Sequence, residues 1–159
     1  MSAGQNTAGV DSSLAGLAPK FRAAVQAALA DCDAVRLNAV VYEANRSHQL
    51  AVLYYARGRT IIPPTATVTN APDETYSWHG FGLAVDVIHR VKQWDMPASW
   101  FASVALIFKR HGCKWGGDWR QRDLPHHQWG ACKPSPSNQA RALLASGGMP
   151  AVWLAVGAS

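Results

Sequence analysis

The chain has 159 residues, of which 48% are hydrophobic, and this supplies enough apolar side chains for a single core. Its formal net charge of +5 favours anionic partners such as nucleic acid, lipid or a bacterial envelope. The basic residues are scattered, however, and do not alternate with aromatic residues as a stacking platform requires, which argues against nucleic-acid binding as the main function. We predict one domain over residues 1–159, with a core from about 14 to 130 and a C-terminal helix and tail over 134–159.

The N-terminal residues 1–13 are small and polar, so we expect no secretory signal peptide. The most apolar tail segment, 149–156, is far shorter than the roughly 20 residues that a transmembrane helix needs. Cys32, Cys113 and Cys132 show no CxxC spacing, and we expect reduced core residues in a chain that folds in a cytosol. A disulfide between Cys113 and Cys132 stays open as an alternative.

Apolar residues recur at helical spacing over 13–31, which predicts an amphipathic helix capped by Ser12 or Ser13. The run 34–42 becomes β-branched and apolar toward its end, and this favours a strand. Such a strand would leave Arg46 at its exit, where a guanidinium group can reach a cleft.

Ser47 can cap a second helix over 48–57, and Gly58 can end it. The segment 61–74 contains three prolines and several threonines, so we predict a loop. The apolar run 83–88 then predicts a buried strand.

A third helix should begin at Asp95 or Met96, with Pro97 in its first turn, and end at Gly112. A last helix is expected over 136–145, with Ser135 as its cap and Gly147 and Gly148 at its end.

The resulting order of helix, strand, helix, loop, strand, helix, strand, strand, helix does not alternate as a doubly wound fold does. It predicts the α+β class, with helices around a small and mainly antiparallel sheet.

The stretch from Ser77 to Asp86 carries the most specific chemical signal. Asp86 is a lone charge within the apolar strand, and such a charge must be paired or must bind a metal ion. Glycines at 80 and 82 permit a turn through positive φ, so the His79 ring can fold back over the strand that holds Asp86. These two side chains can supply half of a metal site.

The third ligand is expected within residues 123–129, where His126 and His127 are neighbours. Adjacent residues of an extended chain point to opposite faces, so only one of these imidazoles can enter the site. The pattern alone does not choose between them.

The motif Ser-x-His-x-x-Gly-x-Ala-x-Asp, followed by Asp-x-Pro-His, resembles the zinc-dependent peptidoglycan peptidases of family M15. This family includes D-alanyl-D-alanine carboxypeptidases and the L-alanyl-D-glutamate endopeptidases of phage endolysins. The resemblance implies one zinc ion per chain, held by His79, Asp86 and His126, with Asp123 as the catalytic acid/base. It also implies the fold that these peptidases share with hedgehog signalling domains.

A second block, 43–54, resembles the family segment in which an arginine binds the substrate. The resemblance implies catalytic and substrate-binding roles for Arg46, and substrate contacts for Gln49. Ser77 is expected either to contact substrate or simply to form the turn.

With three protein ligands and one open position, a zinc site is of the catalytic type, and bound water can attack a peptide carbonyl. The implied function is a bacteriolytic L-alanyl-D-glutamate endopeptidase acting on the peptidoglycan stem peptide. The alternatives are a D-alanyl-D-alanine carboxypeptidase, a non-catalytic zinc-containing binding module and, from the two-histidine, one-carboxylate pattern alone, an Fe(II) oxygenase. As a phage lysin the chain would be a monomer, remain in the host cytoplasm until lysis, and reach the periplasm and cell wall through a holin.

Overall fold

The computed structural model describes residues 10–57, 59 and 69–159, so Gly58 and most of the predicted loop 61–74 lie outside it. The helices and strands follow the predicted order. They are α2 (Pro19–Ala34), β1 (Ala39–Glu43), α3 (His48–Ala56), η1 (Glu74–Tyr76), η2 (Trp78–Phe81), β2 (Ala84–His89), α4 (Ala98–Arg110), β3 (Cys113–Trp115), η3 (Gly116–Asp118), β4 (His126–Trp129) and α5 (Asn138–Ala155), where η marks a 3-10 helix.

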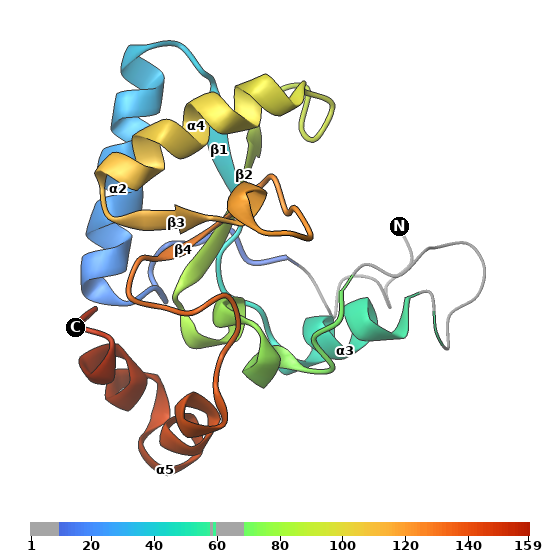
Figure 1. Ribbon diagram of the computed structural model, residues 1–159, viewed down its shortest axis with the longest axis vertical. Helices are drawn as coiled ribbons and strands as arrows, with labels where there is room; N and C mark the ends of the chain where they lie inside the picture. Colours follow the sequence, from blue (N-terminus) through green and yellow to red (C-terminus); the bar gives the residue numbers. More distant parts are fainter. Residues whose placement is uncertain (1–9, 58, 60–68) are drawn as a thin grey trace.

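Within the described residues the strands form one four-stranded sheet in the order β1-β2-β4-β3, and every neighbouring pair is antiparallel (Figure 1). The two central strands are therefore β2 and β4, the strands that contain Asp86 and His126. The predicted α+β class, with helices around a small antiparallel sheet, is confirmed.

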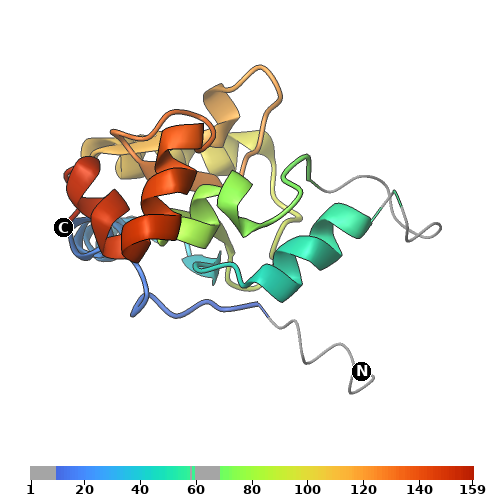
Figure 2. The same cartoon turned by 90° about the horizontal axis from the view of Figure 1, so that it is seen from below.

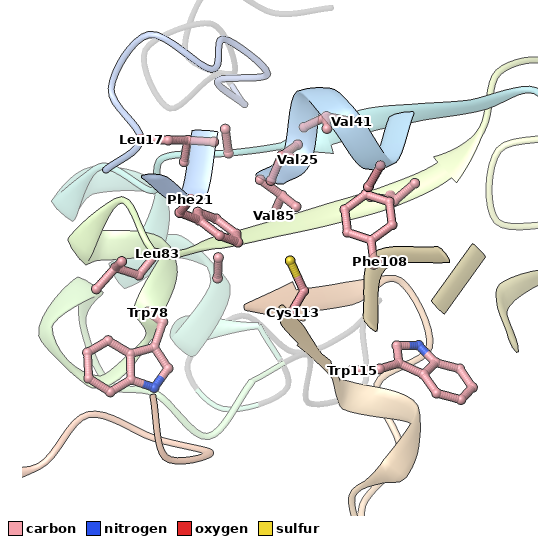
Figure 3. Close-up of a cluster of buried hydrophobic side chains, with 14 of the residues drawn as sticks. Leu17, Phe21, Val25, Val41, Trp78, Leu83, Val85, Phe108, Cys113 and Trp115 are labelled. Carbon is pink, nitrogen blue, oxygen red and sulfur yellow. The ribbon is translucent and has the colours of Figure 1, made fainter. Parts of the chain in front are cut away.

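One face of the sheet is covered by α2 and α4 and forms the core. Figure 3 shows Phe21 and Val25 of α2 and Phe108 of α4 gathered around Val85 of β2. All four side chains are fully buried. Because side chains alternate along a strand, the neighbours of Val85 point away from this core and toward the opposite face.

The helices α3 and α5 lie away from this covered face, α3 at the far side of the molecule from α2 (Figures 1 and 2). The C-terminus lies beside the first turn of α2, where the Lys20 amide donates to the Ala158 carbonyl at 2.9 Å. Trp153 of α5 donates its indole N–H to the Phe81 carbonyl at 2.6 Å. These contacts hold α5 against η2.

The first helix begins at Pro19 instead of residue 13, so the prediction of its start was wrong. Ala18, and neither Ser12 nor Ser13, occupies the N-cap position, and none of the described side chains caps the helix. A proline disfavours the helical conformation of the residue before it, and Ala18 is accordingly extended with ψ 138°. Proline itself suits the first helical position.

The first strand begins at Ala39 instead of residue 34. The helix α2 continues to Ala34, and the chain then reverses through Arg36 and Asn38, which have positive φ values of 57° and 58°. The prediction placed residues of this turn in the strand because their local sequence carries no glycine or proline to mark it.

The helix α4 begins at Ala98, later than predicted, because Pro97 is extended (ψ 155°) and serves as the N-cap residue instead of standing in the first turn. Gly112, with φ 83°, follows its C-terminus as predicted.

The last helix was misplaced at both ends. Ser137, not Ser135, is its N-cap, and the Ser137 hydroxyl accepts from the Ala140 amide at 3.1 Å. Gly148 leaves the helical conformation with φ 70°, as predicted for a glycine at a helix end. The chain then forms a second helical segment, which has Pro150 in its first turn and continues to Ala155. The two glycines therefore mark a kink.

The three cysteines are free and buried, as expected for core residues. Burial raises the pKa of the Cys113 and Cys132 thiols to about 12. Among the described helices, none combines the length and the apolar character that crossing a bilayer requires.

Candidate metal centre

His79 lies in η2, a short helix that folds back over the sheet. The Ser77 hydroxyl caps this helix by accepting from the His79 amide at 3.3 Å, and Gly82 ends it in the left-handed conformation with φ 68°. A Cβ atom at Gly82 would stand 2.7 Å from the Gly16 carbonyl oxygen, so both the conformation and the close approach require glycine. Of the two glycines predicted to turn through positive φ, only Gly82 does so. Gly80 lies inside η2 without a positive φ, and its lack of a side chain instead avoids a clash with the Glu74 carbonyl group.

The tautomer of His79 follows from its hydrogen bond to the backbone. Its Nδ1 lies 3.0 Å from the Ala44 carbonyl oxygen, and a carbonyl can only accept, so Nδ1 carries the proton. This leaves the lone pair of Nε2 free. The Nε2 atom points to Asp86, whose Oδ1 lies 3.3 Å away.

His126 is oriented by an equivalent chain of hydrogen bonds. Its Nε2 lies 2.8 Å from Gln128 Oε1, while Gln128 Nε2 donates to the Lys133 carbonyl at 2.8 Å. Since the amide nitrogen is used for the carbonyl, Oε1 must accept, and His126 Nε2 carries the proton. The free atom of His126 is therefore Nδ1, which lies 3.5 Å from Asp86 Oδ1.

The three free ligand atoms converge on one point. His79, Asp86 and His126 each offer one atom, and these atoms lie within 4.8 Å of one another. Asp86 Oδ1 is buried and has no hydrogen-bond partner among the described residues. Two ligand atoms at about 2.0–2.1 Å from a tetrahedral ion stand about 3.3 Å apart. The separations of 3.3 and 3.5 Å between Asp86 Oδ1 and the two imidazole nitrogens therefore suit a shared metal ion.

The electrostatics of the cluster call for a cation. Burial raises the pKa of Asp86, but the imidazoles of His79 and His126 lower it more, so that this pKa lies well below the ordinary value. Burial lowers the pKa of His79, but the Asp86 carboxylate raises it to above its ordinary value. In the metal-free chain a proton can balance the carboxylate, and in the same position a metal ion would do so with two neutral imidazoles.

Asp123 lies at the edge of this cluster, just before β4. Its Oδ2 is 4.0 Å from His126 Nδ1, and its side chain is 48% exposed. Burial and the nearby Asp86 carboxylate raise the pKa of Asp123. A carboxylate beside a metal site can accept a proton from water and return it to a leaving group.

Arg46 is placed next to His79 by the backbone, since the Arg46 amide donates to the His79 carbonyl at 3.1 Å. Its guanidinium Nε donates to Glu43 Oε1 at 2.6 Å, and its charge lies 5.0 Å from the centre of the Tyr54 ring. A cavity of about 230 Å³ borders Arg46, Ser47 and His79. The arginine is therefore held at the cluster, as its position after β1 predicts.

The remaining predicted site residues occupy less central positions. Ser77 caps η2 and so forms the turn, which is one of the two roles expected for it. Gln49 is exposed in the first turn of α3, whose N-cap is Ser47 as predicted. Neither residue makes a hydrogen bond to the three converging side chains within the described part of the chain.

His127 points to the opposite face of the sheet. Its ring stacks on Phe108 with 4.2 Å between centroids and an angle of 28°. Burial, together with the neighbouring His126, lowers the pKa of His127 to about 3. The structure thus brings His126 to Asp86 and leaves His127 as a neutral core residue.

Sequence reasoning missed the groups that orient these side chains. The Ala44 carbonyl and Gln128 fix the two histidine tautomers, and Glu43 holds Arg46. The alternation of side chains along β4 could have indicated Gln128, since residues 126 and 128 share one face of the strand. A backbone carbonyl leaves no such signal.

Comparison with known proteins shows what this chain resembles in sequence and in fold. Residues 71–129 match the profile of a peptidase M15 family described as D-alanyl-D-alanine carboxypeptidase, a segment that contains all three converging residues. The crystal structure of the L-Ala D-Glu endopeptidase ChiX from Serratia marcescens is 20% identical to this chain. That alignment covers 80% of this chain and 95% of ChiX, with a TM-score of 0.49.

Proposed function

We propose that the chain is a zinc-dependent hydrolase that cleaves peptide bonds in bacterial peptidoglycan, because residues 71–129 match the profile of a peptidase M15 family. The observation that carries the proposal is the convergence of His79 Nε2, Asp86 Oδ1 and His126 Nδ1, with the buried Asp86 oxygen lacking any other partner among the described residues. Two nitrogens and one carboxylate oxygen match a catalytic zinc site, which keeps one position open.

We assign the proton transfer to Asp123. When bound, zinc supplies a Lewis acid that polarises a carbonyl and lowers the pKa of water from 15.7 to about 7. The Asp123 carboxylate, 4.0 Å from His126 Nδ1 and partly exposed, would take a proton from the attacking water. It would then return this proton to the leaving amine.

We assign carbonyl recognition to Arg46. Its Nε is held by Glu43, and no hydrogen bond to another described residue occupies the terminal nitrogens of the guanidinium group, which would contact a substrate oxygen. A positive charge at this point stabilises the negative oxygen that develops during attack, and the loss of one such donor typically costs about 10²–10³ in rate. Gln49 and Ser77 are proposed to contact the substrate peptide beside Arg46.

Two candidate reactions on the stem peptide differ in the bond that is cleaved. We propose cleavage between L-alanine and D-glutamate in the stem peptide, on the resemblance of the Asp-x-Pro-His motif to endolysin endopeptidases. The description of the matched family favours a second candidate, D-alanyl-D-alanine carboxypeptidase. The first reaction needs a site open at both ends, and the second needs a partner for a free carboxylate.

Mass spectrometry of digested peptidoglycan tests both. A new N-terminal glutamate indicates the endopeptidase, and release of free D-alanine indicates the carboxypeptidase. Chelation should abolish either product, and one equivalent of zinc should restore it. If the protein binds peptidoglycan without releasing either product, it acts as a binding module and the proposed hydrolysis is wrong.

We further propose a lytic setting, in which a phage-encoded chain acts as a monomer on the wall after a holin opens the inner membrane. The net charge of +5 suits an anionic envelope. Addition of the purified protein to cells with a permeabilised outer membrane should clear the suspension, and expression in a host without a holin should not.

A further inference from the structure

Glu43 is a buried carboxylate that none of the assigned steps uses. It is the last residue of β1 and is only 1% exposed. Both of its oxygens have partners, since Oε1 accepts from Arg46 Nε at 2.6 Å and Oε2 accepts from the Tyr54 hydroxyl at 3.0 Å. A buried charge is costly unless it is paired and hydrogen-bonded, so the fold has built a specific environment for this group.

A β-bulge directs Glu43 toward the metal centre. Val41 pairs with Val87, but the next pair is Glu43 with Asp86, so Tyr42 is an extra residue in β1. Without the bulge, Tyr42 would stand opposite Asp86. Bulges often re-aim a side chain next to an active site, and here the residue that faces Asp86 becomes a glutamate.

The same carboxylate lies behind His79. Glu43 Oε1 is 3.7 Å from His79 Nδ1, the nitrogen that donates to the Ala44 carbonyl. Negative charge on this side of the ring favours the tautomer with the proton on Nδ1 and makes the opposite nitrogen a better ligand. One oxygen atom therefore contacts the arginine of the site and also lies close to a metal ligand.

We infer that Glu43 is a positioning residue that orients His79 for metal binding and Arg46 for substrate binding through a single buried carboxylate. The inference rests on the proposed function and deepens it. The competing explanation is an ion pair that stabilises the fold and has no effect on the metal centre. The two explanations differ in metal affinity, which can be measured without any substrate.

Glu43→Gln separates them, because it keeps the shape of the side chain and removes its charge. We expect zinc affinity, measured by competition with a chromophoric chelator, to fall about 10- to 100-fold, the usual effect of losing a group that orients a metal ligand. The ratio kcat/KM on a stem peptide should fall further, because Arg46 also loses its partner. The matched control is Asp31→Asn, which removes a carboxylate 2.6 Å from His111 on a different part of the fold.

The outcomes distinguish this inference from the proposed function. Absence of zinc binding and cleavage in the wild-type protein would refute the proposed function itself. If the wild type binds and cleaves, and Glu43→Gln binds zinc as tightly as Asp31→Asn does, the positioning role is refuted and the function stands. Should Glu43→Gln not fold, Tyr54→Phe replaces it, because this variant removes only the hydrogen bond to Oε2 and keeps both charges. We expect a several-fold loss of zinc affinity in Tyr54→Phe, and unchanged affinity would refute the positioning role.

Discussion

Asp86 and His126 are direct partners across the antiparallel ladder of β2 and β4, and Asp86 Oδ1 lies 3.5 Å from His126 Nδ1. Residues that face each other in such a ladder share one side of the sheet with their Cβ atoms about 4.5–5.5 Å apart. The register therefore determines which of the two adjacent histidines meets Asp86. His127, paired with Val85, must join the core on the other side.

The first prediction concerns this choice. His126→Ala should lose stoichiometric zinc, because it removes one of three converging ligand atoms. His127→Phe should keep zinc, because it fills a core position that stacks on Phe108. Metal content after dialysis against zinc-free buffer is the measurement. Retention of zinc in His126→Ala together with its loss in His127→Phe would show that the ligand assignment is wrong.

The second prediction separates proton transfer from metal binding. Asp123→Asn should retain zinc while kcat falls by about 10²–10⁴, the range typical of a missing general acid/base. The control is Asp118→Asn, an exposed residue that pairs with Lys109 at 2.6 Å in the same part of the chain. Equal loss of activity in the two variants, or loss of zinc from Asp123→Asn, would contradict the assignment.

The order of helices and strands could be predicted because it is indicated by the hydrophobic periodicity and by the positions of glycine and proline. The strand around Asp86 and the helix capped by Ser47 were located almost to the residue. The boundaries that failed lie where local signals are weak. Arg36 and Asn38 adopt positive φ values that few non-glycine residues take, and the sequence there offers no glycine or proline, only Asn38, to indicate a turn.

The site residues that belong to recognisable sequence motifs could be predicted. His79, Asp86 and His126 follow from residue type and spacing, together with a family resemblance that chose between two histidines. Glu43 could not be found in this way. A bulge at Tyr42 changes which residue of β1 faces Asp86, and the short, mostly apolar sequence of that strand carries no mark of the irregularity.

The third prediction tests the turn that carries His79. Gly82→Ala places a side chain at φ 68° and a Cβ atom 2.7 Å from the Gly16 carbonyl oxygen. Gly112→Ala is the matched control, since its φ is 83° but its Cβ atom would meet no described residue within 4 Å. The left-handed conformation alone costs about 1–2 kcal/mol. Urea unfolding of the metal-free variants should show this loss for Gly112→Ala and a larger one for Gly82→Ala.

The steric clash at residue 82 should also weaken zinc binding. A shift of the backbone at Gly82 moves the end of η2, so zinc affinity should fall in Gly82→Ala and stay unchanged in Gly112→Ala. Equal unfolding free energies and equal zinc affinities for the two variants would mean that the chain relaxes around Gly82 without moving His79.

The fourth prediction is a pH dependence of stability that arises from His127. Burial lowers its pKa to about 3 in the folded chain, against an ordinary value of 6.5, so the unfolded chain binds the extra proton first as pH falls. The contribution is complete above pH 6.5 and is lost toward pH 3, which amounts to about 2 kcal/mol between pH 7 and 5. His127→Phe cannot take up this proton. In urea unfolding with a chelator present, the free energy of the wild type should therefore drop by that amount relative to His127→Phe, whereas parallel pH profiles would mean that His127 is not held neutral by the core.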